Sequence, residues 1–228
     1  MRDADRTDQS ASLCVSASEN DQLYKRLWHP IAFLRQSFLI SPQTFTNEYS
    51  TAPLSIFSTE TMHFLLLGAS GRTGQHVVSE ILSQGHTATA LVRTSSNIVP
   101  RPGLTIVTGS PLSKPDIRSA LAATPSPPSA AIITLNTVRK SDSPFAAQLS
   151  PLRFLADSCA NVCGVLENAG IHRVVVMSTA GAGDSWGNLP LLSKVFLRWT
   201  NVKYALEDHS LVDKEMRLRQ LDWTLVRL

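Results

Sequence analysis

The sequence has 228 residues, of which 43% are apolar and 17% charged, and its net charge is +3. This composition excludes a disordered or collagen-like chain, and no apolar run approaches the roughly 20 residues that a membrane-spanning helix needs. The basic residues do not form the clustered stripe that nucleic-acid binding requires, so we expect no nucleic-acid partner.

The composition divides the chain near residue 61. All 11 glycines lie at or after Gly68, and residues 1–61 carry five Lys and Arg against seven Asp and Glu. We expect residues 1–61 to form an N-terminal extension, partly helical or disordered, and residues 62–228 to form one domain. Apolar residues recur at helical spacing from Leu23 to Ile40, around Pro30. This segment packs on the domain, lies on a membrane surface or remains an ill-ordered extension.

From residue 62 onward, predicted strands and helices alternate. Strands are expected at His63–Leu67, His86–Val92, Leu104–Val107, Ala130–Leu135, Arg173–Met177 and Trp223–Val226. Helices are expected at Gln75–Ser83, Pro115–Ala122, Pro151–Ala169 and Lys203–Gln220, and Gly85 and Gly170 are expected to end the first and third. Apolar strands alternating with helices predict a doubly wound, Rossmann-like α/β fold. Its parallel sheet has helices on both faces, and the fold is apparently short at the C-terminus.

Two groups of residues have structural interpretations. Cys159 and Cys163 share a helix face with Leu152, Leu155, Val162 and Leu166, and we interpret them as small core residues. The charges Glu207, Asp208, Asp213, Lys214 and Glu215 are interpreted as a solvated helix face. No metal site is expected, because the sequence has no Cys/His cluster. Few cysteines and no visible signal peptide predict a cytoplasmic protein.

A glycine-rich segment follows the first predicted strand and opens the first helix. It reads Gly68-Ala69-Ser70-Gly71-Arg72-Thr73-Gly74, with the form GxxGxxG. Gly68 permits the turn, Gly71 permits close approach of a pyrophosphate, and Gly74 permits the helix to pack on the sheet. The helix N-terminus offers N–H groups to phosphates, and Ser70, Arg72 and Thr73 add donors. This context predicts dinucleotide binding; the alternative is a loop that keeps the fold and binds nothing.

The end of the second strand indicates which dinucleotide is bound. An NAD site commonly places Asp or Glu there to accept hydrogen bonds from the ribose 2′-hydroxyl. Here the strand runs into Arg93, with no acid nearby, and a guanidinium group can pair with a 2′-phosphate. We therefore predict NADP(H) in preference to NAD(H), the alternative being that Arg93 is an ordinary surface arginine.

Four stretches carry a family resemblance: GASGRTG, LVR, HRVVVMSTAGAGDS and LDWTLVR, at the ends of strands one, two, five and six. Residues 62–228 resemble the atypical short-chain dehydrogenase/reductases, in the NAD(P)H-binding group with the NmrA-like proteins. The stretches MSTAGAGDS and EDHSLVDKE with LDWTLVR resemble more narrowly the averufin oxidase family of fungal polyketide-cluster oxidoreductases. The family's Tyr-x-x-x-Lys pair is absent, because Tyr204 is followed four residues later by Asp208.

Candidate catalytic residues lie after the fourth and fifth strands, where a doubly wound sheet binds its ligand. Asn136 follows strand four and is assigned to the cofactor. Ser178 ends strand five and matches the family's catalytic serine position; its alternative is a hydroxyl that bonds backbone. Asp184 relays a proton or caps the next helix. Tyr204 and His209 lie in the following helix, where His209 suits acid–base chemistry or is a solvated surface residue.

These features favour an NADP(H)-dependent oxidoreductase that acts on a small aromatic, polyketide-type substrate in fungal secondary metabolism. The first alternative is a non-catalytic, NAD(P)-binding redox-sensing regulator of the NmrA type. The second is a truncated gene product that folds poorly. The sequence does not indicate the oligomeric state.

Overall fold

The structure is a computed structural model that describes residues 60–227. Residues 1–59 of the predicted extension lie outside the described residues, and the amphipathic segment from Leu23 to Ile40 is among them. None of the helices in the described part is long and apolar enough to cross a membrane.

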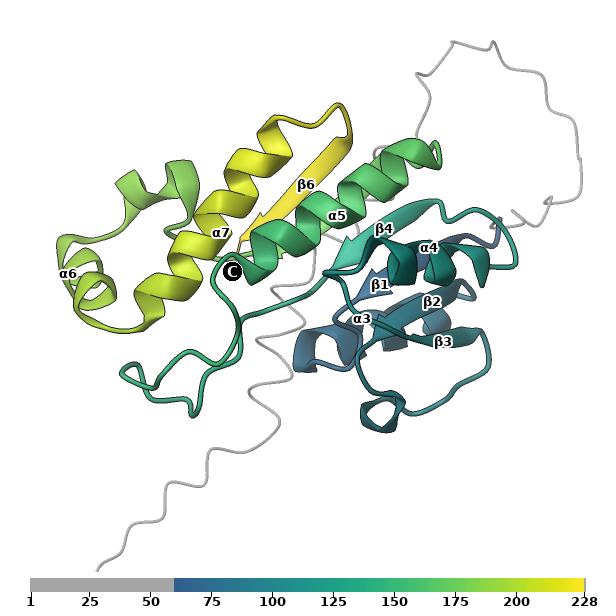
Figure 1. The fold of residues 1–228 in the computed structure, drawn as a ribbon, viewed down its shortest axis with the longest axis horizontal. Helices are drawn as coiled ribbons and strands as arrows, with labels where there is room; N and C mark the ends of the chain where they lie inside the picture. Colours follow the sequence, from purple (N-terminus) through teal and green to yellow (C-terminus); the bar gives the residue numbers. More distant parts are fainter. Residues whose placement is uncertain (1–59, 228) are drawn as a thin grey trace, which may run out of the picture. The chain divides into compact units, whose positions relative to one another are not determined.

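Six parallel strands form one sheet, drawn as arrows in Figure 1. They are β1 (His63–Leu67), β2 (Thr87–Val92), β3 (Leu104–Thr108), β4 (Ala130–Ile133), β5 (Arg173–Ser178) and β6 (Asp222–Arg227). Their order is β3-β2-β1-β4-β5-β6, and every neighbouring pair is parallel. The strand order reverses between β1 and β4, which makes a crevice at their carboxyl ends. All six strands were predicted within two residues of these bounds.

Helices cover both faces of the sheet. They are α3 (Arg72–Ser83), α4 (Lys114–Ala122), α5 (Phe154–Asn168), α6 (Leu191–Trp199) and α7 (Val202–Arg217), with short 3₁₀ helices η1 (Ser95–Asn97) and η2 (Gly183–Asn188). The main core lies between the sheet and α4, α5 and α7, and α3 packs on the opposite face (Figure 1). The predicted doubly wound α/β fold is confirmed.

Helix boundaries differ from the predictions where loops interrupt the pattern. Helix α3 begins at Arg72 rather than Gln75, because the glycine loop leads directly into its first turn. Helix α5 begins at Phe154 rather than Pro151, after Arg153 in a left-handed conformation with a φ of 61°. Leu152, predicted on the inner face of this helix, precedes it and is 74% exposed. Helix α6 was not predicted at all.

The two helical cysteines belong to the core, as predicted. Cys159 and Cys163 are buried and free, and both pack in the cluster between α5 and the sheet. Burial raises the pKa of Cys163 to about 11, with Arg219 opposing the shift, and burial also raises the pKa of Cys159. Both thiols therefore stay protonated and act as small apolar side chains.

Candidate cofactor and catalytic site

The glycine loop closes around backbone atoms that leave no room for side chains. A Cβ on Gly74 would lie 2.1 Å from the carbonyl oxygen of Gly68, and one on Gly71 would lie 3.3 Å from the same atom. The Gly71 N–H donates to that carbonyl at 3.0 Å, which closes the turn. Close approach of the backbone therefore requires glycine at position 74, as the GxxGxxG pattern predicts, whereas a Cβ at position 71 would make only a tight contact.

The N-terminus of α3 is open to an anion. Gly71 is its N-cap, and no side chain caps the first turn. The first N–H groups of the helix therefore remain available, with the partial positive charge of the helix terminus. Ser70, Arg72 and Thr73 surround this end, and the Arg72 side chain is exposed. A loop without Cβ atoms beside an uncapped helix terminus fits the pyrophosphate of a dinucleotide.

The glycine loop lies directly against the end of β4. Gly68 has a φ of 89°, and a Cβ there would lie 2.7 Å from the carbonyl carbon of Thr134. The Thr134 N–H donates to the Leu67 carbonyl at 2.8 Å. Asn136 follows two residues later and is exposed, and its Oδ1 accepts from the Thr137 N–H at 2.8 Å. The structure therefore brings Asn136 to the same crevice as the glycine loop.

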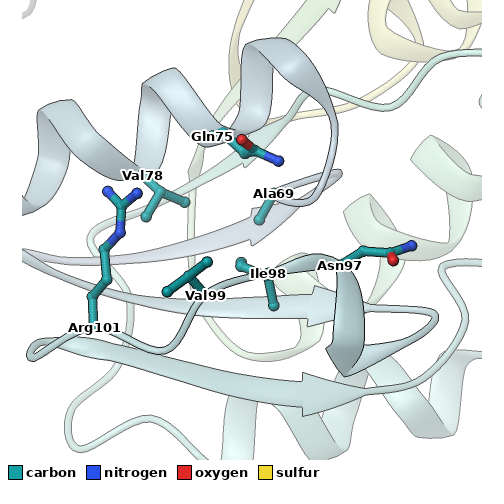
Figure 2. Close-up of a pocket in the computed structure, with 7 residues that line it drawn as sticks. All are labelled: Ala69, Gln75, Val78, Asn97, Ile98, Val99 and Arg101. Atoms are coloured by element: carbon teal, nitrogen blue, oxygen red, sulfur yellow. The ribbon is translucent and has the colours of Figure 1, made fainter.

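Beyond β2, the chain presents Arg93 rather than an acid. Arg93 is exposed immediately after the strand. The segment that follows forms one wall of a hollow of about 50 Å³, and the glycine loop and α3 form the other (Figure 2). Ala69, Gln75 and Val78 face Ile98 and Val99 across it. In doubly wound folds the adenosine ribose lies beside the end of β2, next to this hollow.

Ser178 and His209 are both buried polar residues. Val174, Val176 and Ser178 alternate along β5 toward the face that α7 covers. Ser178 is 4% exposed and His209 is 5% exposed, and within the described residues neither Ser178 Oγ nor His209 Nδ1 has a hydrogen-bond partner. Burial lowers the pKa of His209, although the Asp208 carboxylate opposes this shift. His209 is not the solvated residue that its helix position also allowed.

Asp184 takes part in a four-residue ion-pair network. Its carboxylate accepts from Arg217 at 2.8 Å and from Arg227 at 2.7 Å. The same two arginines pair with Asp213, at 2.9 Å and 2.8 Å. Burial raises the pKa of Asp184, but the two guanidinium groups outweigh this effect and lower it overall. The network ties η2, which contains Asp184, to α7 and to the end of β6.

Tyr204 and Asp208 lie in the first two turns of α7. Tyr204 is half-buried, and Lys203 Nζ lies 5.0 Å from the centre of its ring. The Asp208 carboxylate accepts from the backbone N–H groups of Leu155 at 2.8 Å and Ala156 at 3.0 Å. Asp208 therefore caps α5 from a neighbouring helix. The lysine position of the Tyr-x-x-x-Lys pattern holds a structural residue in this chain.

The predicted solvated face of α7 is wrong for two of its five charges. Asp208 and Asp213 are 3% and 4% exposed, whereas Glu207 and Lys214 are exposed. A helical projection explains the difference, because positions 208, 209, 212, 213 and 216 share one face with the apolar residues of α7. Thr179, which follows Ser178, is half-buried and is the more accessible residue of the two.

Comparison with known proteins places this site in a family. A family model described as NAD(P)H-binding matches residues 68–228, from the first glycine of the loop onward. The chain belongs to the NAD(P)H-binding family. No curated protein matches it significantly. The resemblance to NAD(P)H-binding proteins is thereby confirmed at the level of this family.

Solved structures share the fold of this family member at low sequence identity. ChuY, titled an anaerobillin reductase from Escherichia coli O157:H7, is 22% identical with a TM-score of 0.56, over 72% of this chain and 71% of that one. A short-chain dehydrogenase/reductase from Veillonella parvula in complex with NADP is 17% identical with a TM-score of 0.56, over 73% and 68%. The Bordetella bronchiseptica enzyme WbmH in complex with NAD⁺ is 17% identical with a TM-score of 0.57, over 73% and 56%. The chain thus has the fold of an NAD(P)-dependent oxidoreductase.

Proposed function

We propose that the protein is an NADP(H)-dependent oxidoreductase that acts on an aromatic polyketide-type substrate, such as an anthraquinone or xanthone derivative. The glycine loop carries the proposal: its Cβ-free turn and the uncapped terminus of α3 fit a dinucleotide pyrophosphate. The preference for NADP(H) is supported by Arg93, which is exposed where an NAD site commonly has an acid. The substrate class is supported by the resemblance of residues 177–185, 207–215 and 221–227 to the averufin oxidase family.

Each candidate residue has a proposed role. The bound cofactor supplies or accepts the hydride, and the protein orients the substrate and handles the proton. Ser178 and Thr179 offer hydroxyls at the carboxyl end of β5, and Tyr204 offers one from the first turn of α7. Burial lowers the pKa of His209, which favours the neutral imidazole and suits a proton acceptor. Asp184 holds η2 in place through Arg217 and Arg227.

Cofactor preference is tested by reversing one charge. Calorimetric titration with NADPH and NADH is compared for the wild type and Arg93→Asp. Loss of a charged contact to the 2′-phosphate, worth roughly 1.5–3 kcal/mol, lowers NADPH affinity at least about tenfold. Lys214→Asp makes a similar charge change at an exposed site on α7 and leaves NADPH affinity unchanged. Equal affinity of the wild type for both cofactors contradicts the proposed preference.

Substrate class is tested by turnover. We expect NADPH to be oxidised when hydroxyanthraquinones or hydroxyxanthones are added, and Thr179→Val and Tyr204→Phe to separate the contributions of the two accessible hydroxyls. If a broad aromatic panel causes no oxidation by a protein that binds NADPH, the enzymatic proposal fails.

That failure would favour a second function, a redox-sensing regulator of the NmrA type. The observation that supports it is Asp208, which occupies the lysine position of the family's catalytic pair and caps α5 instead. A regulator of this type binds NADP(H) without turnover, and it retains a partner protein in one redox form of the cofactor only.

A further inference from the structure

Helix α6 presents an apolar stripe that no described part of the chain covers. Leu192, Val195, Phe196 and Trp199 stand at positions i, i+3, i+4 and i+7, and their exposed fractions are 82%, 45%, 51% and 82%. None of the nine residues of α6 is buried. Figure 1 shows α6 beyond α7, away from the sheet. A helix in a soluble core turns such a stripe inward, so its outward orientation marks an interaction surface.

The loop before α5 extends this surface. Asn201, just after α6, donates from its backbone N–H to the Pro144 carbonyl at 2.8 Å and from its Nδ2 to the Phe145 carbonyl at 2.8 Å. These bonds hold the loop against the junction of α6 and α7. Phe145 and Leu149 in this loop are 67% and 62% exposed. We call the α6 stripe together with Phe145 and Leu149 the α6 face.

Basic residues border the α6 face. Arg198 lies on the flank of the apolar stripe, and Lys203 follows in the first turn of α7. Lys194 lies on the opposite side of α6, where its Nζ donates to the Gly187 carbonyl at 3.0 Å. Arg139 and Lys140 lie in the adjoining loop, which also carries one exposed carboxylate, Asp142. The chain contains no Asp or Glu from Ser185 to Leu206. The α6 face is therefore both apolar and cationic.

From this combination we propose that the α6 face binds the surface of an anionic lipid membrane, with α6 lying in the plane of the interface. Helices of this kind place aromatic and aliphatic side chains among the acyl chains and Lys or Arg against anionic headgroups. The charge also argues against a second copy of this chain, because two such faces would bring Arg198 and Lys203 against the same cations of the partner. The proposal is independent of cofactor binding and turnover.

Vesicle flotation with the full 228-residue chain tests the proposal. We expect binding to phosphatidylcholine vesicles containing about one third phosphatidylserine to be at least tenfold stronger than binding to pure phosphatidylcholine vesicles, and to weaken as salt rises. The double variant Arg198→Glu/Lys203→Glu loses this preference. Leu192→Ser/Phe196→Ser loses binding to both kinds of vesicle. The control Leu218→Ser, at a residue 80% exposed after α7, binds like the wild type.

Three outcomes overturn the proposal. The first is the absence of vesicle binding, and the second is binding that the α6 substitutions leave unchanged. The third is a dimer, measured by light scattering without lipid, that Leu192→Ser/Phe196→Ser converts to a monomer, since a second copy then covers the α6 face. All variants are expected to melt within about 2 °C of the wild type, because exposed substitutions away from special features change stability little. Normal melting separates a lost surface from a lost fold.

Discussion

Replacing Asp208 by alanine tests the cap that joins α7 to α5. Asp208 is 3% exposed, and its two carboxylate oxygens accept from the Leu155 and Ala156 N–H groups. Within the described residues, the N-cap of α5 itself, Arg153, has a left-handed backbone and makes no side-chain capping bond. Alanine leaves two buried N–H groups unpaired at the start of the helix that fills the centre of the core.

The expected loss follows from these two bonds. Hydrogen bonds to a charged group contribute roughly 1.5–3 kcal/mol each, and partial relaxation reduces their sum, so we expect Asp208→Ala to lose about 3 kcal/mol of unfolding free energy. For a domain of this size about 2–4 °C of melting temperature is lost per kcal/mol, which gives a fall of roughly 6–12 °C. Asp208→Asn keeps one acceptor oxygen, so its melting temperature lies between those of the wild type and Asp208→Ala.

Differential scanning fluorimetry measures the effect, with unfolding in urea as a second assay. Glu207→Ala is the matched control, since it removes an exposed carboxylate one residue earlier on the same helix. A melting temperature for Asp208→Ala within about 2 °C of the Glu207→Ala value would refute the capping role.

Two further predictions concern the glycine loop and the pH dependence of stability. Gly74→Ala places a Cβ 2.1 Å from the Gly68 carbonyl oxygen, so it abolishes NADPH binding and lowers the melting temperature. Gly71→Ala places its Cβ 3.3 Å from the same oxygen, so this variant folds normally and only its NADPH binding weakens. Calorimetry and thermal melting distinguish the two variants. Because burial lowers the pKa of His209 below its ordinary 6.5, the unfolded chain takes up this proton first as the pH falls. The stability that neutral His209 contributes is complete above about pH 6.5 and is lost as the pH falls below that value. His209→Leu therefore flattens the acid side of the plot of melting temperature against pH. The control His172→Leu, at an exposed residue, leaves that plot unchanged.

The local patterns predicted the sheet and the glycine loop well. The strand His63–Leu67 is fully buried, and its apolar run followed by glycine left little choice of structure. The GxxGxxG spacing predicted close contacts that the geometry confirms at Gly68 and Gly74. Both signals are contained in a few consecutive residues, which is why they can be read from one sequence.

Contacts between distant residues could not be predicted in this way. Asp208 caps a helix that begins more than 50 residues earlier, and Asp213 is buried only because Arg217 and Arg227 neutralise it. Charge alone favoured a solvated interpretation of both, since an unpaired buried carboxylate is costly. Helix α6 was not predicted, although Leu192, Val195, Phe196 and Trp199 stand at the spacing of an amphipathic helix, so the sequence carried the signal for it.

The central claim is that the loop from Gly68 to Gly74 and the N-terminus of α3 bind a dinucleotide. Calorimetric titration of the purified chain with NADPH tests it most directly, with a thermal melt of the same sample to establish folding. We predict saturable binding of one NADPH per chain and a higher melting temperature in its presence. A folded sample that takes up neither NADPH nor NADH, with no shift in melting temperature, would contradict the claim.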